Sequence, residues 1–137
     1  MKMLIAVIAL AGTLTGGMAE AAPIDGNNLL KACRLVVKFD DGEKLPLNQG
    51  IDVGYCIGLL GGVRSTVTTI FLDEPTSKSI YRICFPYIGI SNGEAARIVV
   101  KFLENHPDNL NEDPTWLTLL ALREAYPCKC REAYPCK

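Results

Sequence analysis

The spacing of the cysteines restricts the fold of this chain more than any other feature. Four of the six are spread widely along the sequence: Cys33, Cys56, Cys84 and Cys128. The other two lie within the last eight residues. In an exported protein the default state of such residues is the disulfide. We therefore expect a small domain cross-linked by two disulfides, for which four cysteines allow three pairings.

The N-terminus has the order of a signal peptide. Lys2 precedes the apolar run Leu4–Leu14, and the small-x-small sequence Ala19–Ala21 follows it. A run of about 11 apolar residues is too short to span a bilayer, which takes about 20. We therefore expect a cleavable leader over residues 1–21 and prefer it to a buried N-terminal helix. One exported domain over 22–129 and a tail over 130–137 remain.

The charge of the chain excludes several kinds of partner. The formal net charge is −1. Removal of the leader does not change it, because the leader contains one positive residue, Lys2, and one negative residue, Glu20. The sequence has no basic stripe for a nucleic acid. It also lacks a Lys/Arg-rich run that would hold the mature form on anionic lipid. We expect neither partner.

Hydrophobic periodicity predicts an all-α fold, a small disulfide-stabilised bundle of four main helices arranged as two hairpins. The first helix follows the N-cap Asp25 and ends near Lys38, and the second covers Asp52–Leu72. The third begins at Ser91, where Ser91 and Glu94 form a capping box, and stops before Pro107. The fourth follows Asp113. It is apolar almost all round, including Trp116, so we expect it to be the central helix.

The segments between these helices are less regular. Residues 39–50 and 73–79 are predicted to be polar loops. Residues 80–90 are predicted to be extended, because Pro86 excludes a helix there, and Ile80–Phe85 has the composition of a short strand. In the second helix, Gly54, Gly58 and Gly62 recur every four residues and leave a stripe without side chains. Such a stripe suits close approach of another backbone, whereas Arg64 and several threonines disfavour a transmembrane helix.

Hairpin geometry favours one disulfide pairing. Cys33 lies near the end of the first helix and Cys56 near the start of the second, so an antiparallel pair brings them level. Cys84 precedes the third helix and Cys128 follows the fourth. In an antiparallel pair of these helices, the two cysteines also lie at the same end. We predict Cys33–Cys56 and Cys84–Cys128.

No catalytic or metal site is predicted, and no cofactor. His106 is the only histidine, so a cysteine hydrolase would need it as its base. Its place in the last turn of a helix fits a favourable interaction with the helix dipole better. The tail cysteines are spaced Cys-x-Cys-x₅-Cys, whereas structural zinc sites usually draw their ligands in two separated pairs.

Four stretches in order resemble the periplasmic immunity proteins of the Tai/Rap type. They are "DGNNLLKAC", "GYCIGLLGGV", "ICFPYIGISNGEAARIVVKFLENHPDNLNEDP" and "LTLLALREAYPC", and together they span Asp25–Cys128. The resemblance implies an α-helical periplasmic domain that forms a homodimer. It also implies that the domain blocks the active-site groove of a type VI secretion effector, an NlpC-type cysteine amidase that cuts peptidoglycan.

The sequence departs from that family in two places. Tyr87 is bulky where a simpler Pro-x-Gly turn is expected, so we expect this turn to differ in shape from that of the family. The tail repeats "REAYPCK" after Cys130, whereas the family pattern stops at one "PC". Repeats that share a core need units of about 20 or more residues, so we interpret residues 130–137 as a duplicated appendage.

Two other functions compete with this hypothesis. A small periplasmic stress chaperone would also be helical and disulfide-bonded, but the sequence has no acidic clusters beside apolar patches. A secreted enzyme would need an active site, and none is predicted.

Effector contacts are expected in a polar loop that protrudes from a rigid support. The first choice is the short segment between the third and fourth helices, which consists of Asp108, Asn109, Leu110, Asn111 and Glu112. Leu110 would be its apolar anchor. The loop around Leu47 competes with it, and an ordinary solvated connection is the plain alternative. In a dimer, the second subunit would present Arg97, Lys101 and Glu104 from the third helix.

Residues 130–137 should be dispensable. A truncation after Lys129 removes no predicted helix and no predicted disulfide. The truncated protein should keep the melting temperature and the inhibitory strength of the full chain, measured by thermal unfolding and by an amidase assay. A marked shift in melting temperature, or half the inhibition, would show that the tail belongs to the domain.

Overall fold

The structure is a computed structural model that describes residues 24–73 and 82–128. The predicted leader over 1–21 and the tail over 130–137 lie outside these ranges. So do most of the predicted 73–79 loop and the first two residues of the possible strand at Ile80–Phe85.

Four α-helices make up most of the described chain, which contains no strand, so the all-α prediction is confirmed. A short 3₁₀ turn at Leu47–Gln49 precedes the second helix, and another at Pro107–Asn109 follows the third. The helices are α1 (Gly26–Asp40), α2 (Gly50–Asp73), α3 (Asn92–Asn105) and α4 (Pro114–Ala125).

Three helices begin where the capping residues predict. The Asp25 carboxylate accepts hydrogen bonds from two backbone N–H groups of the first turn of α1, and the Asn28 side chain completes a capping box. Ser91 Oγ accepts from the Glu94 N–H at 3.0 Å, and Asp113 accepts from the first turn of α4. Each cap satisfies donors that have no partner within the helix.

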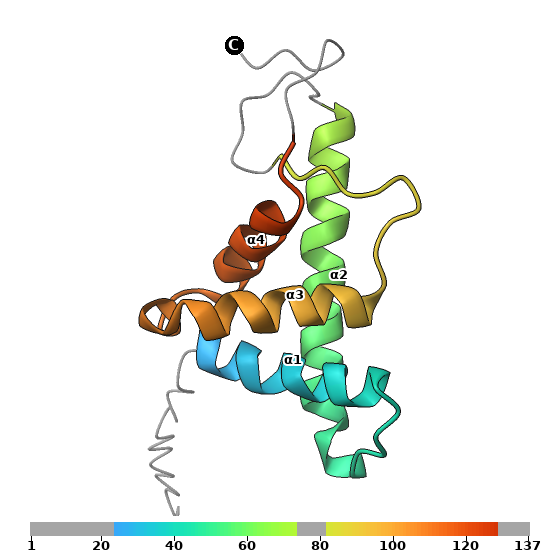
Figure 1. Ribbon diagram of the computed structural model, residues 1–137, viewed down its shortest axis with the longest axis vertical. Coiled ribbons are helices and arrows are strands. Elements are labelled where there is room, and N and C mark those ends of the chain that lie inside the picture. The colour runs from blue at the N-terminus through green and yellow to red at the C-terminus, as the bar shows by residue number, and fades with distance from the viewer. Residues whose placement is uncertain (1–23, 74–81, 129–137) are drawn as a thin grey trace, which may run out of the picture.

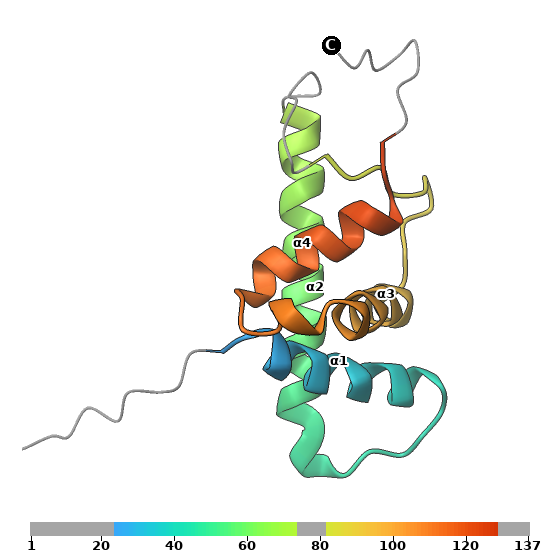
Figure 2. The ribbon, with the colours of Figure 1, turned by 60° about the vertical axis from the view of Figure 1, so that its left-hand side comes forward.

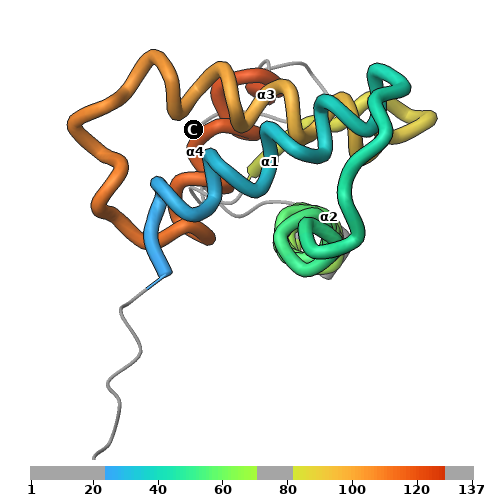
Figure 3. The backbone as a smooth tube through the Cα atoms, turned by 90° about the horizontal axis from the view of Figure 1, so that it is seen from below, coloured from blue at the N-terminus to red at the C-terminus, as the bar shows by residue number. Residues whose placement is uncertain are grey.

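The helices cross in two directions. Figure 1 shows α1 and α3 side by side, with α2 running steeply across both, and Figure 3 shows α2 end-on while α1 and α3 lie in the plane. In Figure 2, α4 lies obliquely across α2 and also packs on α3. The expectation of two antiparallel hairpins was therefore wrong for α1 and α2. The connection of residues 41–49 is long enough to turn the chain into a new direction.

Both predicted disulfides are present. Cys33 and Cys56 join α1 to α2 with a Cα–Cα distance of 5.2 Å, and both are fully buried. Cys84 and Cys128 join the segment before α3 to the residues after α4, with a Cα–Cα distance of 5.0 Å. The predicted pairing is confirmed, although α1 and α2 do not form the antiparallel hairpin from which the first bridge was inferred. Two crossing helices also come close at one point, and Cys33 and Cys56 lie there.

The core surrounds the first disulfide. All four helices contribute completely buried leucine or valine side chains to it: Leu29, Leu60, Val99, Leu103 and Leu117. A second apolar cluster joins α2 to α4 and contains Val63, Val67, Ile83, Leu119 and Leu122. Each fully buried aliphatic side chain contributes about 1.5–3 kcal/mol.

Helix α4 is only partly the central helix that its composition predicts. Leu117 and Leu122 are completely buried, and the buried Thr118 hydroxyl donates to the Pro114 carbonyl at 2.8 Å. Trp116, however, is 38% exposed. No other described element packs against the outer side of α4. The prediction that α4 is buried on all sides was therefore wrong for the side that carries Trp116.

The segment before α3 is held against the end of α4 without forming a strand over residues 82–85. The Cys84 N–H donates to the Tyr126 carbonyl at 3.0 Å, and the Phe85 and Tyr126 rings lie 5.6 Å apart. The Tyr126 hydroxyl donates to Glu94 Oε1 at 2.6 Å. Burial, and then this hydrogen bond, raises the pKa of Tyr126 to about 12. Tyr126 therefore connects three parts of the chain.

Alanine in place of two glycines should have opposite effects on stability. A Cβ at Gly26 would lie 2.5 Å from Leu117 Cδ1 and 2.9 Å from the Leu110 carbonyl oxygen. Gly26→Ala should therefore lower the free energy of unfolding by about 1–3 kcal/mol, as overpacking does. The control is Gly58→Ala in the middle of α2, where a Cβ meets nothing within 4 Å. It should raise stability by up to about 1 kcal/mol. Urea unfolding measures both, and equal shifts of the same sign would contradict the packing.

Tyr126→Phe should change how stability depends on pH. Between pH 10 and pH 12 the unfolded phenol loses its proton while the folded one keeps it. The wild-type free energy of unfolding should therefore fall as the pH rises through this range. The variant should be less stable by about 1 kcal/mol at pH 8, because the hydrogen bond is lost, and should lose less stability above pH 10. Urea unfolding at pH 8, 10 and 11 measures the free energy of unfolding of both proteins. Equal losses of stability in the wild type and the variant between pH 8 and pH 11 would contradict this prediction.

Candidate functional site

The residues considered for catalysis have structural partners. His106 is the C-cap residue of α3, with Nδ1 2.8 Å from the Phe102 carbonyl oxygen and its ring stacked on Phe102 at 4.3 Å. The cysteines of the described chain are all in disulfides, so His106 has no thiolate partner there. Over the same residues, no cluster of three or more histidine, cysteine or acidic side chains could hold a metal ion.

The predicted contact segment at Asp108–Glu112 is attached to the start of α1. The Leu110 carbonyl accepts hydrogen bonds from the Asn27 N–H at 3.1 Å and from Asn27 Nδ2 at 3.2 Å, and the Glu112 carbonyl accepts from the Gly26 N–H. Leu110 is half-buried and packs against the core. Asp108, Asn111 and Glu112 are exposed, and Asn109 is half-buried. The segment is rigid, but its apolar residue faces its own chain.

Two of the three predicted contact residues on α3 form ion pairs with α1 and with its C-cap residue, Asp41. Arg97 reaches both Asp40 and Asp41 at 2.5 Å, and Glu104 pairs with Arg34 at 2.8 Å. All of these side chains are partly exposed, and such pairs contribute up to about 1 kcal/mol each. Lys101 is exposed and takes part in none of them. These pairs hold α3 along α1, while Lys101 remains open to a partner.

Two adjacent large apolar side chains are exposed in the turn Pro86–Gly89, which we call the 86–89 turn. Tyr87 is 106% exposed and Ile88 is 94% exposed. The Gly89 N–H donates to the Pro86 carbonyl at 2.8 Å, which closes the turn, and Gly89 has a φ of +75° that glycine adopts without strain. The yellow segment that contains the turn stands away from the helices in Figure 1.

Both ends of this turn are fixed to the helices. On its N-terminal side, Cys84 is bonded to Cys128 and to the Tyr126 backbone. On its C-terminal side, Arg64 of α2 donates to the Ile90 carbonyl at 2.7 Å and to Asn92 Oδ1 at 2.5 Å. From the sequence, Tyr87 was recognised only as a departure from the family pattern. The missed signal was two large apolar residues between Pro86 and Gly89, where a turn exposes its central side chains.

A hollow of about 980 Å³ lies beside the turn. Its walls are α2 and the extended residues 83–90. From α2 it is lined mainly by small and polar side chains: Gly61, Arg64, Ser65, Thr68 and Thr69. The opposite wall is mainly apolar, with Ile83, Phe85 and Ile90, so polar side chains line the hollow only on its α2 side.

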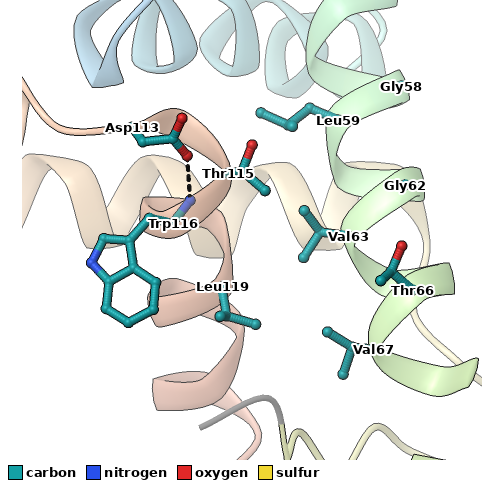
Figure 4. Close-up of a pocket in the computed structure, with 10 residues that line it drawn as sticks. All are labelled: Gly58, Leu59, Gly62, Val63, Thr66, Val67, Asp113, Thr115, Trp116 and Leu119. Atoms are coloured by element: carbon teal, nitrogen blue, oxygen red, sulfur yellow. Dashed lines mark hydrogen bonds between the residues drawn. The ribbon is translucent and has the colours of Figure 1, made fainter. Parts of the chain in front are cut away.

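A second groove of about 450 Å³ separates α2 from α4. Figure 4 shows Leu119 of α4 facing Val63 and Val67 of α2, while the Trp116 ring is turned away from α2. Gly58 and Gly62 also line this groove, and a Cβ at either would meet nothing within 4 Å. The expected close approach of another backbone to the glycine stripe is therefore not made within the described chain. Among the helices described, none is both long and apolar enough to cross a membrane.

Comparison with known proteins identifies the family. The family model of the Rap1a immunity proteins matches residues 25–128, which is nearly the whole described domain and both of its disulfides. No significant match was found among curated proteins or among solved structures. A family match of this extent implies an inhibitory role without catalysis, through binding to a partner effector. The chain is thus a member of the Rap1a immunity protein family.

Proposed function

We propose that this protein binds a type VI secretion effector in the periplasm and inhibits it, and that the effector is an NlpC-type cysteine amidase that cuts peptidoglycan. The observation that carries the proposal is the family match over residues 25–128. The two disulfides support an oxidising location, because they persist in exported proteins. The sequence resemblance supports the choice of amidase.

Inhibition of this kind needs shape and rigidity. The protein would occupy the substrate groove of the amidase and exclude the peptide stem, and its own residues would transfer no proton or bond. A rigid binder loses less conformational entropy on association. Two disulfides, three capped helices and the ion pairs between α1 and α3 all limit that loss.

The exposed polar residues of the Asp108–Glu112 segment remain proposed contacts at the rim of such a complex. Its acidic side chains suit a basic rim, and Lys101 is free of the pairs made by its neighbours. Leu110 is a weaker candidate because it already packs on its own core. We also propose a homodimer, as the resemblance implies, which sedimentation at micromolar concentration would detect.

The test is inhibition of the NlpC-type amidase encoded nearest to the gene of this protein. At a one-to-one ratio the protein should reduce the release of cleaved stem peptides from purified peptidoglycan at least tenfold. Co-expression in the periplasm should also prevent lysis by the amidase. A papain-like hydrolase that does not act on peptidoglycan serves as the control and should keep its activity. Full amidase activity at a hundredfold excess of this protein would overturn the proposal.

A further inference from the structure

We propose that the 86–89 turn is the apolar anchor by which this protein enters the substrate groove of its effector, with Tyr87 and Ile88 as the contacting side chains. The inference rests on the function proposed above and specifies its contact surface. It moves the main anchor from Leu110 to the other end of α3.

Exposure is the first argument. Tyr87 and Ile88 are adjacent and exposed at 106% and 94%. Single exposed apolar residues are common on proteins, but two large neighbours at the end of a protruding turn have no packing role in the chain. Tyrosine is also enriched among the residues that contribute most to binding energy at protein interfaces. A partner would gain from covering both side chains.

Rigidity is the second argument. The 86–89 turn is closed by its own hydrogen bond and held on both sides by the Cys84–Cys128 disulfide and by Arg64. The loop at Leu47 and the first turn of α2 that follows it are the natural comparison, because Leu47 is 100% exposed and Ile51 is 85% exposed. The 3₁₀ turn of this loop is likewise closed by a backbone hydrogen bond, from the Gln49 N–H to the Pro46 carbonyl at 3.0 Å, but it has no side-chain cap and no disulfide of its own. It therefore has fewer attachments to the rest of the chain than the 86–89 turn and would lose more conformational entropy on binding.

Shape is the third argument. An enzyme that cuts peptide stems must bind an extended chain, so its groove is narrow. A helix with its side chains is about 10–12 Å across and fits such a groove poorly. A turn of two central residues is narrower. Ser65 and Thr68, on the α2 wall of the hollow beside the turn, would provide polar contacts for the rim of the groove.

The two proposed contact regions lie at opposite ends of α3. The turn precedes the helix and the Asp108–Glu112 segment follows it, and the helix has 14 residues. At 1.5 Å per residue its ends are about 21 Å apart. A single short protrusion therefore carries only one of the two regions. The exposed turn suits the centre of the contact better than the docked segment does.

The experiment compares matched pairs of substitutions. The double variant Tyr87→Ala/Ile88→Ala removes only exposed side chains, so its melting temperature should equal that of the wild type. Its dissociation constant for the amidase, measured by calorimetry, should rise about 30-fold or more, as expected for a central anchor. The control variant Leu47→Ala/Ile51→Ala removes a similar exposed apolar area and should change the constant less than about threefold.

Cross-linking gives a second measurement that does not depend on the stability of the variants. A photoreactive phenylalanine analogue at position 87 should cross-link to the amidase, and peptide mapping should place the link in its active-site groove. The same analogue at position 47 should not link to the groove.

The outcomes separate this inference from the proposed function. If the wild type binds the amidase and the Tyr87→Ala/Ile88→Ala variant binds equally well, the inference is overturned while the proposed function stands. If the Leu47→Ala/Ile51→Ala variant loses affinity in its place, the anchor lies before α2 and the inference is again overturned. If the wild type does not bind the amidase, the proposed function fails, and the inference fails with it.

Discussion

The disulfide between Cys33 and Cys56 is the constraint on which the fold depends. It lies where α2 crosses α1, both cysteines are fully buried, and leucine and valine side chains from all four helices pack around it. It closes a loop of 23 residues, which in the chain-entropy account stabilises the fold by about 3 kcal/mol. A domain of this size has a small core, so a cross-link at its centre is a large share of its stability. Helix α3 then packs along α1, and α4 covers the other side of α3 and part of α2.

The second disulfide has a different role, because it organises the surface. Cys84–Cys128 connects the two segments that leave the helical core, and Tyr126 adds a backbone hydrogen bond, a ring contact and a hydroxyl bond to Glu94 at the same place. The 86–89 turn follows directly. Its exposed side chains are thus presented by a segment that is attached to the helices on both sides. This division suits an inhibitor, in which the core supplies stability and a rigid protrusion supplies recognition.

The charged residues of α3 show why a contact surface is hard to infer from helical periodicity. Arg97 and Glu104 face outward in the sequence pattern, and they do lie at the surface. Their partners, however, are Asp40, Asp41 and Arg34, which are between 56 and 70 residues away in sequence. The pattern separates buried from exposed faces. It does not say whether an exposed charge already has a partner within the chain.

The sequence by itself determined the helical class, the capped starts of three helices and the family, and the cysteine pairing inferred from it was correct. The predicted loop over residues 39–50 was too long, because α1 continues to Asp40, a 3₁₀ turn forms at Leu47–Gln49 and α2 begins at Gly50. Caps and breakers act within one turn of the chain, so Asp25, Ser91 and Asp113 could be read locally. Only the tertiary structure decided the steep crossing of α2, the exposure of Trp116 and the docking of Leu110 on α1. The 86–89 turn belongs to the same group, because its prominence depends on what packs around it. Burial and crossing angle are set by side chains from distant segments. Periodicity identifies the apolar face of a helix, but it does not identify the element that packs against that face.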